Sequence, residues 1–85
     1  MEYIIVAFRS RTQTVKLNKI LQSMGINSEI VNTPKEAGVG CGLSVKISPY
    51  YFERVKSVVF SVGFSAFAGF FMVKITANKK FVRSI

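Results

Sequence analysis

Residues 10–25 read SRTQTVKLNKILQSMG, and residues 48–63 read SPYYFERVKSVVFSVG. Aligned at an offset of 38 positions without a gap, both stretches begin with serine, end with glycine and place apolar residues along one helix face. A serine hydroxyl suits the start of a helix, and glycine suits its end because it adopts a left-handed backbone without strain. The matched core positions are Leu17 with Val55, Ile20 with Val58 and Leu21 with Val59, and Met24 matches Val62 at the helix end. The sequence therefore predicts two similar amphipathic helices, although periodicity alone would produce some of these matches.

Each predicted helix lies between stretches typical of β-strands. The predicted strands are residues 3–8, a continuous apolar run, residues 27–32, a half-polar edge strand, residues 43–47, which alternate, and residues 65–75, which are long and apolar. Two βαβ units that cannot bury their helices alone would share one core. We therefore expect an α+β, ferredoxin-like βαββαβ domain, with a four-stranded antiparallel sheet in the order 4-1-3-2 and two helices on one face.

The predicted domain spans residues 1–75, and residues 76–85 form a basic C-terminal tail without a regular pattern. The uncharged stretch 57–73 reaches the lower length limit of a membrane-spanning helix, which is about 17 residues. Gly63 divides this stretch between a helix and a strand, so we expect no membrane span. The N-terminus lacks the basic segment and cleavage site of a signal peptide.

The composition narrows the function classes. The chain has twelve Lys and Arg residues but only four Glu residues, which gives a net charge of +8 and favours anionic partners. The chain has no His and no Asp, so conventional acid–base catalysis, a metal site and a cofactor are not expected. A single cysteine, Cys41, excludes an internal disulfide and favours a cytoplasmic location.

The loop from Thr33 to Gly42 is the candidate site. Thr33 and Glu36 have the spacing of a capping box, and Pro34 suits the first position of a short helical turn. In a split βαβ arrangement the first two strands are parallel, so Arg9 and Arg11 lie at the same sheet end as this loop, which also holds Lys35.

Cys41 is the candidate reactive group within that loop. Gly40 and Gly42 flank it, which leaves its thiol sterically open. Nearby cations and a helix N-terminus favour a thiolate, which can carry a sulfur or selenium atom as a persulfide-type adduct. A small, buried and inert cysteine is the alternative.

The segments Thr33-Pro34-Lys35-Glu36 and Cys41-Gly42-Leu43-Ser44-Val45 resemble the signature of the putative selenium/sulfur carrier protein-like family. This resemblance extends from Tyr3 to about Val73. It implies that Cys41 carries the transferred atom, that Pro34, Lys35, Glu36 and Gly42 shape the loop, and that donor and acceptor proteins are the partners. The resemblance therefore favours a carrier protein over an enzyme. Lys35 replaces the usual arginine, and neither the aromatic last strand nor the basic tail follows from the family pattern.

Two other functions are compatible with the sequence. A basic ferredoxin-like domain can bind RNA by stacking bases on exposed rings, here Phe64, Phe67, Phe70 and Phe71, although the third strand lacks the RNA-recognition signature. The chain can also be an interaction module. The last strand has Phe67, Phe71 and Val73 on one face and Phe70 and Met72 on the other. One of these faces would be bare in a monomer, which predicts a homo-oligomer through the sheet.

Overall fold

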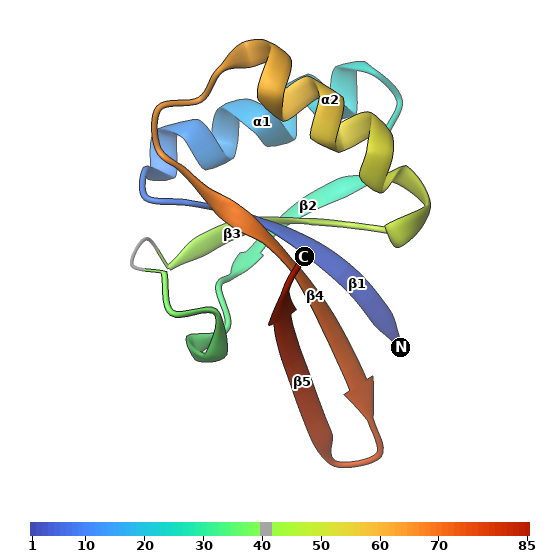
Figure 1. Cartoon of the computed structure of the whole chain (residues 1–85). Coiled ribbons are helices and arrows are strands. Elements are labelled where there is room, and N and C mark those ends of the chain that lie inside the picture. The colour runs from blue at the N-terminus through green and yellow to red at the C-terminus, as the bar shows by residue number, and fades with distance from the viewer. Residues whose placement is uncertain (40–41) are drawn as a thin grey trace.

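The computed structural model describes residues 1–39 and 42–85, and these form two α-helices, two short 3-10 helices and five strands. In chain order the elements are β1 (Glu2–Phe8), α1 (Arg11–Ser23), β2 (Ser28–Asn32), η1 (Lys35–Ala37), β3 (Leu43–Ile47), η2 (Pro49–Tyr51), α2 (Phe52–Val62), β4 (Phe67–Thr76) and β5 (Lys79–Ser84). Figure 1 shows the two helices together above the sheet and η1 below it.

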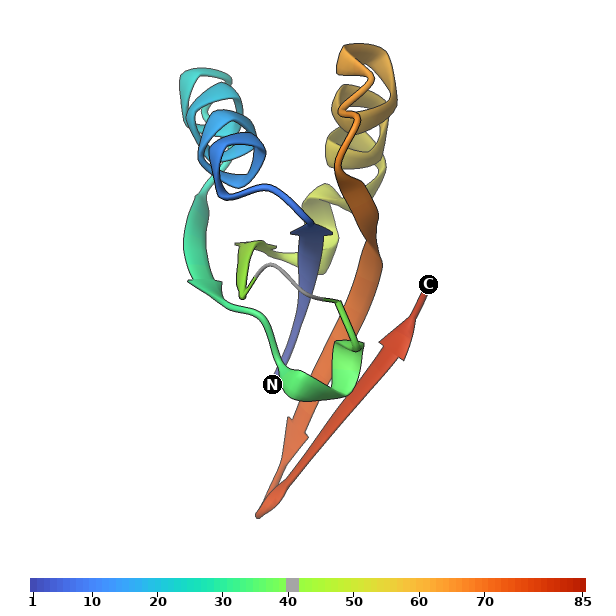
Figure 2. The same ribbon diagram turned by 90° about the vertical axis from the view of Figure 1, so that its left-hand side faces the viewer.

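One antiparallel sheet has the strand order β2-β3-β1-β4-β5. Both β1 and β2 pair with β3 in an antiparallel sense, so β1 and β2 are parallel to one another. The predicted order of four strands is therefore confirmed, and so is the α+β class with two helices. Figure 2 shows the helices side by side at one side of the strands.

The predicted strand number is wrong, because residues 79–84 form a fifth strand. A two-residue turn joins β4 to β5, with Thr76 paired to Lys79 across it. Residues 79–83 alternate too little for a strand signal, since Lys79 and Lys80 are both charged and Phe81 and Val82 are both apolar. This segment forms a strand because it pairs with the long strand β4, although its own residue pattern does not predict one.

Both predicted helical segments begin with a serine cap and are followed by a left-handed glycine, as the repeat predicts. Ser10 caps α1 by accepting the Gln13 N–H, and Ser48 caps η2, which opens the second helical segment, by accepting the Tyr50 N–H. Gly25 and Gly63 have φ angles of +76° and +72°, which is the left-handed region. The stretch 57–73 is thus divided at Gly63, and no helix in the described ranges is long and apolar enough to cross a membrane.

The matched residues of the two helices are also buried to the same extent. Leu17 and Val55 are fully buried, as are Leu21 and Val59, while Ile20 and Val58 are half-buried. Met24 and Val62, which match at the helix ends, are 40% and 41% exposed, so the match at these positions does not extend the core. Each directly precedes the left-handed glycine that follows its helix.

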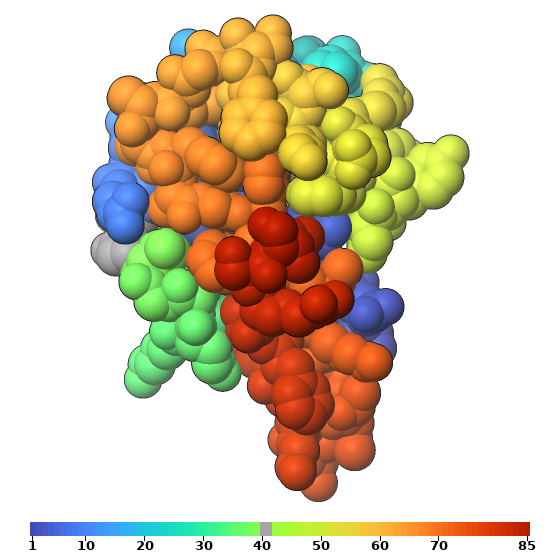
Figure 3. Space-filling view, in the orientation of Figure 1, coloured from blue at the N-terminus to red at the C-terminus, as the bar shows by residue number. Residues whose placement is uncertain are grey.

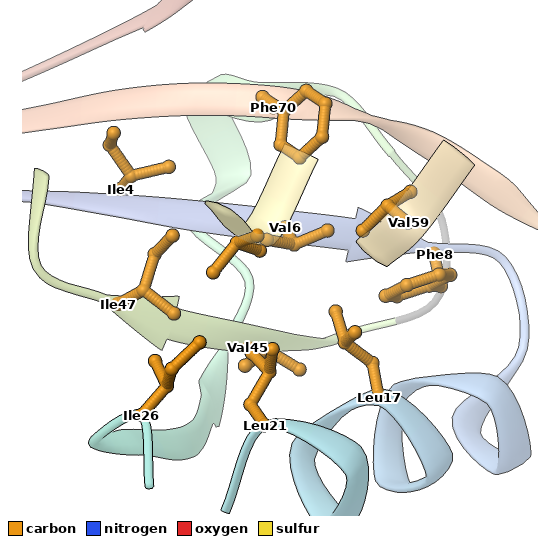
Figure 4. Close-up of a cluster of buried hydrophobic side chains, with 11 residues drawn as sticks. Ile4, Val6, Phe8, Leu17, Leu21, Ile26, Val45, Ile47, Val59 and Phe70 are labelled. Atoms are coloured by element: carbon orange, nitrogen blue, oxygen red, sulfur yellow. The ribbon is translucent and has the colours of Figure 1, made fainter. Parts of the chain in front are cut away.

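The main core lies between the helices and one face of the sheet. Figure 4 shows Leu17 and Leu21 of α1 and Val59 of α2 directed at side chains from the central strands. The strand residues of this core are Ile4, Val6, Phe8, Val45, Ile47 and Phe70. Burial of this apolar surface is the main force that joins the two halves.

The opposite face of the sheet is covered by the chain itself. Ile5, Ala7, Phe71 and Val73 are buried there, and the residues packed on them include Ala37 and Val39 beside η1 and Val82 of β5. The expectation of a bare face would need Phe71 to be exposed, but its exposed fraction is 9%. The reason for predicting an oligomer through the sheet is therefore overturned.

A β-bulge changes the faces of β4. Ala7 pairs with Gly69 but Phe8 pairs with Phe67, so one extra residue lies in β4 at this point. Phe67 consequently packs with Phe70 on the helix side, with ring centroids 4.9 Å apart, instead of with Phe71. Phe70 is 5% exposed, so the interpretation that Phe70 and Phe71 stack bases is also wrong.

Candidate functional site

Four chain segments meet at one end of the sheet. There β1 ends at Phe8, α1 begins at Arg11, β2 ends at Asn32 and β3 begins at Leu43. Figure 1 shows this end, with the start of α1 beside the start of β3. The predicted juxtaposition of the β1–α1 turn with the β2–β3 loop follows from the parallel relation of β1 and β2.

Hydrogen bonds hold the two ends of the Thr33–Gly42 loop together. The Thr33 N–H donates to the Gly42 carbonyl at 2.9 Å, and the hydroxyls of Thr33 and Ser44 lie 2.6 Å apart. The Thr14 hydroxyl of α1 lies 3.0 Å from the Ser10 carbonyl and 3.4 Å from the Leu43 carbonyl, and its single proton is shared between these two acceptors. Thr14 and Ser44 are fully buried, so these bonds are protected from water and tie the loop to both the sheet and the first helix.

The first part of the loop turns beneath the sheet. Pro34 is buried and directly precedes η1, while Lys35 and Glu36 are exposed. Ala37 and Val39 pack on the sheet face opposite the helices, which Figure 2 shows as the separation of η1 from α1 and α2. The apolar residues of the loop therefore anchor it, and its charged residues face solvent.

The predicted capping box does not form. Pro34 is the residue that precedes η1, and no side chain caps this short helix. The Thr33 hydroxyl is instead bonded to Ser44, because that bond closes the loop across the β2–β3 pair. A local sequence pattern is here overridden by a contact between strands.

Arg9 and Arg11 are exposed on the helix side of the same sheet end. Their backbone is fixed by the α2–β4 connection: the Arg9 N–H donates to the Ala66 carbonyl at 2.7 Å. Gln13 donates to the Ser65 hydroxyl at 2.8 Å and accepts the Ala66 N–H at 2.8 Å. The start of α1 is thus clamped to the second half of the chain, and both guanidinium groups project from a rigid base.

The predicted site residues do not form one cluster. Arg9 and Arg11 lie with the helices, whereas Lys35 and Glu36 lie with η1 beneath the sheet. Gly42 is exposed between the two groups and has a φ angle of +86°, which favours glycine. Gly40 and Cys41 lie outside the described residues.

A shallow basic surface, open to solvent, lies along α1 away from this sheet end. It is formed by residues of this one helix, namely Arg11, Thr12, Val15, Lys16, Lys19 and Ile20. A hollow of about 440 Å³ lies at the opposite end of the sheet, around Glu2, Asn27 and Tyr51, and is too remote to belong to the loop. Among residues 1–39 and 42–85, no three His, Cys, Asp or Glu side chains are grouped so that they could hold a metal ion.

Sequence reasoning missed the residues that position the loop. Thr14 and Ser44 contact the loop, and Gln13 holds the start of α1 against the α2–β4 connection; each was expected to be an ordinary helix or strand residue. A signal did exist for Thr14, which is a polar residue on the same helix face as Leu17 and Leu21, whereas the alternation of residues 43–47 places Ser44 on the polar face.

A comparison with protein families matches residues 2–66 to the model described as "Putative Se/S carrier protein-like". The chain belongs to this family. The matched part includes both helices and the whole Thr33–Gly42 loop, and it ends one residue before β4. No curated protein and no solved structure matches the chain.

Proposed function

We propose that this protein carries sulfur or selenium between a donor and an acceptor protein as an adduct on Cys41. The observation that carries the proposal is the closure of the loop by the Thr33–Gly42 hydrogen bond, within the part of the chain that matches the carrier family. A loop with fixed ends can present a thiol while remaining part of a small domain. It also limits the conformational entropy that is lost when a partner docks.

The proposed chemistry is a thiol exchange that needs no external oxidant. The Cys41 thiolate attacks the terminal sulfur of a donor persulfide, and a new S–S bond forms. The donor's S–S bond breaks, and its electron pair leaves with the donor sulfur as a thiolate. The proton stays on the transferred sulfur, so Cys41 becomes a persulfide with no net redox change. A donor selenopersulfide would transfer selenium in the same way.

The charge at this sheet end supports the proposal. Arg9 and Arg11 are exposed beside the loop, and positive groups stabilise a thiolate before attack. They also attract an anionic donor or leaving thiolate. Because both side chains are in water, the attraction weakens as salt is added.

The basic surface of α1 supports docking of the donor or acceptor. It combines the half-buried apolar residues Val15 and Ile20 with the exposed Lys16 and Lys19. An acidic helix or loop of a partner would suit this combination, because apolar contact supplies affinity and charge supplies orientation. Arg11 belongs both to this surface and to the start of α1, next to the loop end of the sheet.

Intact-mass spectrometry of protein purified without reductant tests the proposal. We expect an added mass of about 32 Da for sulfur or about 80 Da for selenium, removed by a thiol reductant. Cys41→Ser should fold normally and carry no added mass. Lys56→Gln, which removes an exposed charge on α2, should load like the wild type and serves as the control for Arg9→Gln and Arg11→Gln.

Protein that gains no reducible mass, even after incubation with a small-molecule persulfide, would contradict the proposal. Equal loading of the Cys41→Ser variant would contradict it as well, since the adduct would then lie elsewhere.

A further inference from the structure

An aromatic residue surrounded by basic residues lies on one face of the β4–β5 hairpin. Phe81 is directly opposite Lys74 in the strand register. Lys79 and Arg83 lie two residues to either side of Phe81 on β5, and side chains two apart share a face. We call Lys74, Lys79, Phe81 and Arg83 the hairpin face.

The hairpin face is open to solvent. All four residues are exposed, and the exposed fraction of Phe81 is 54%. β5 is an edge strand, and Figures 1 and 3 show the hairpin projecting away from the two helices. Glu2 of β1 is opposite Lys74 in the strand register. Glu2 and Lys74 do not form an ion pair: within the described ranges, the ion pair joins Lys46 and Glu29.

Other exposed aromatic residues have a structural explanation that Phe81 lacks. Phe60 of α2 is 59% exposed, and its ring packs edge-on against Phe67 and Phe70, with centroids 5.9 and 6.0 Å away. Lys56 on the same helix lies over the ring of Phe52. Phe81 is paired with Lys74, on the sheet face that carries the main core, yet it is 54% exposed and belongs to neither buried cluster, so burial does not account for it.

We propose that the hairpin face binds single-stranded nucleic acid. An exposed ring can stack on a base of any sequence, and flanking Lys and Arg side chains can neutralise phosphates on either side of that base. Alternate residues of β5 are about 6.8 Å apart, so the ring has a cation on each side within reach of one extended strand. The net charge of +8 attracts a polyanion to the whole molecule.

The exposed ring of Phe81 favours single-stranded nucleic acid over an acidic peptide as the partner. A peptide would satisfy Lys74, Lys79 and Arg83 but would leave the Phe81 ring without a specific role. Lysines on an edge strand also prevent unwanted sheet pairing, but that purpose would be served better without an exposed phenylalanine. A base uses both the charge and the ring.

Fluorescence anisotropy with a labelled RNA of about 12 nucleotides, a length within known site sizes, tests the proposal. Phe81→Leu should weaken binding about 5-fold or more, because one base loses its stacking partner, and the salt dependence should stay the same. Arg83→Gln should instead reduce the slope of log affinity against log salt by about 0.7, as expected for one lost phosphate contact.

Phe60→Leu and Lys56→Gln are the matched controls, since they remove an exposed ring and an exposed charge from α2. Both should bind nearly as tightly as the wild type. Phe81→Tyr keeps the ring and should retain affinity even if Phe81→Leu is poorly folded. Cys41→Ser should also retain affinity, which keeps this proposal separate from the carrier chemistry.

Equal losses for Phe81→Leu and Phe60→Leu, or for Arg83→Gln and Lys56→Gln, would overturn the proposal because binding would then be diffuse electrostatic attraction. Tight binding of a polyglutamate peptide without binding of RNA or single-stranded DNA would overturn it in favour of an acidic protein partner.

Discussion

The two halves of the chain have nearly the same helical segments, but the segments that follow these helices differ. We call the chain that follows each helix its continuation. In both halves a serine caps the helical segment, two apolar residues of the helix are fully buried and a left-handed glycine follows. After the first unit, β2 has five residues and leads into the Thr33–Gly42 loop. After the second, β4 has ten residues, contains a bulge and continues into β5.

The residues that the two halves share are distinct from the residues of the two candidate sites. The equivalent positions form the core and specify the fold, whereas each continuation carries a separate candidate site. The family match covers the first continuation and ends before the second, at residue 66. The carrier proposal therefore rests on the loop, and the nucleic-acid proposal rests on the hairpin.

The largest expected effect comes from the equivalent core positions Leu17 and Val55. Leu17→Ala should lower the free energy of unfolding by about 2–5 kcal/mol. Val55→Ala removes one carbon fewer, at roughly 0.8 kcal/mol per carbon, and should cost correspondingly less. Urea denaturation should show a single transition for both variants. Two separate transitions would mean that the halves do not share one core.

Gly69 tests the difference between the continuations. It has a φ angle of +141°, and an added Cβ would lie 3.3 Å from the ring of Phe71. Gly69→Ala should therefore cost about 1–3 kcal/mol of unfolding free energy. Val31 occupies the equivalent position in β2, and Val31→Ala is the matched control with a smaller loss. A Gly69→Ala variant as stable as the wild type would argue against the bulge.

Gly25 and Gly63 test the equivalence of the two helix ends. Neither has an atom within 4 Å of an added Cβ, so only the left-handed backbone penalises alanine. Each substitution should lower the unfolding free energy by about 1 kcal/mol. Thermal denaturation of the two variants should give similar shifts, and a large inequality would show that the helix ends are not equivalent.

The smallest expected effect concerns the β4–β5 turn. Ala77 has a φ angle of 43°, which is unfavourable for a residue with a Cβ. Ala77→Gly should relieve this strain and offset the greater flexibility of glycine, which gives a gain below about 1 kcal/mol. Slower amide exchange in residues 79–84 would confirm it, and faster exchange would contradict the turn geometry.

The sequence predicts the architecture well because local signals and core periodicity agree. The strand at Leu43–Ile47 has the predicted bounds, and the repeat locates α1 at both ends and α2 at its end, while the predicted start of the second helix forms η2 instead. The helical turn before Gly38 also forms, as η1. For the two long helices, capping residues and apolar spacing indicate the same element.

The features that the sequence does not predict depend on contacts between distant segments. β5 forms because β4 offers a long edge, and Phe67 changes face because of a bulge at Gly69. The loop closes through Thr14, Thr33 and Ser44, which lie on three different elements. The placement of Arg9 and Arg11 follows from strand topology, but the turn of Lys35 and Glu36 beneath the sheet does not.

The rate of Cys41 alkylation as a function of pH tests the central claim most directly. Positive charge at the loop end of the sheet favours the thiolate, so the pKa of Cys41 should fall below the ordinary thiol value of about 8.5. The alkylation midpoint should therefore lie below that pH. Arg9→Gln and Arg11→Gln should each raise the midpoint, more at low salt than at high salt. A Cys41 that reacts only after denaturation, or with a midpoint at or above about 8.5, would contradict the account.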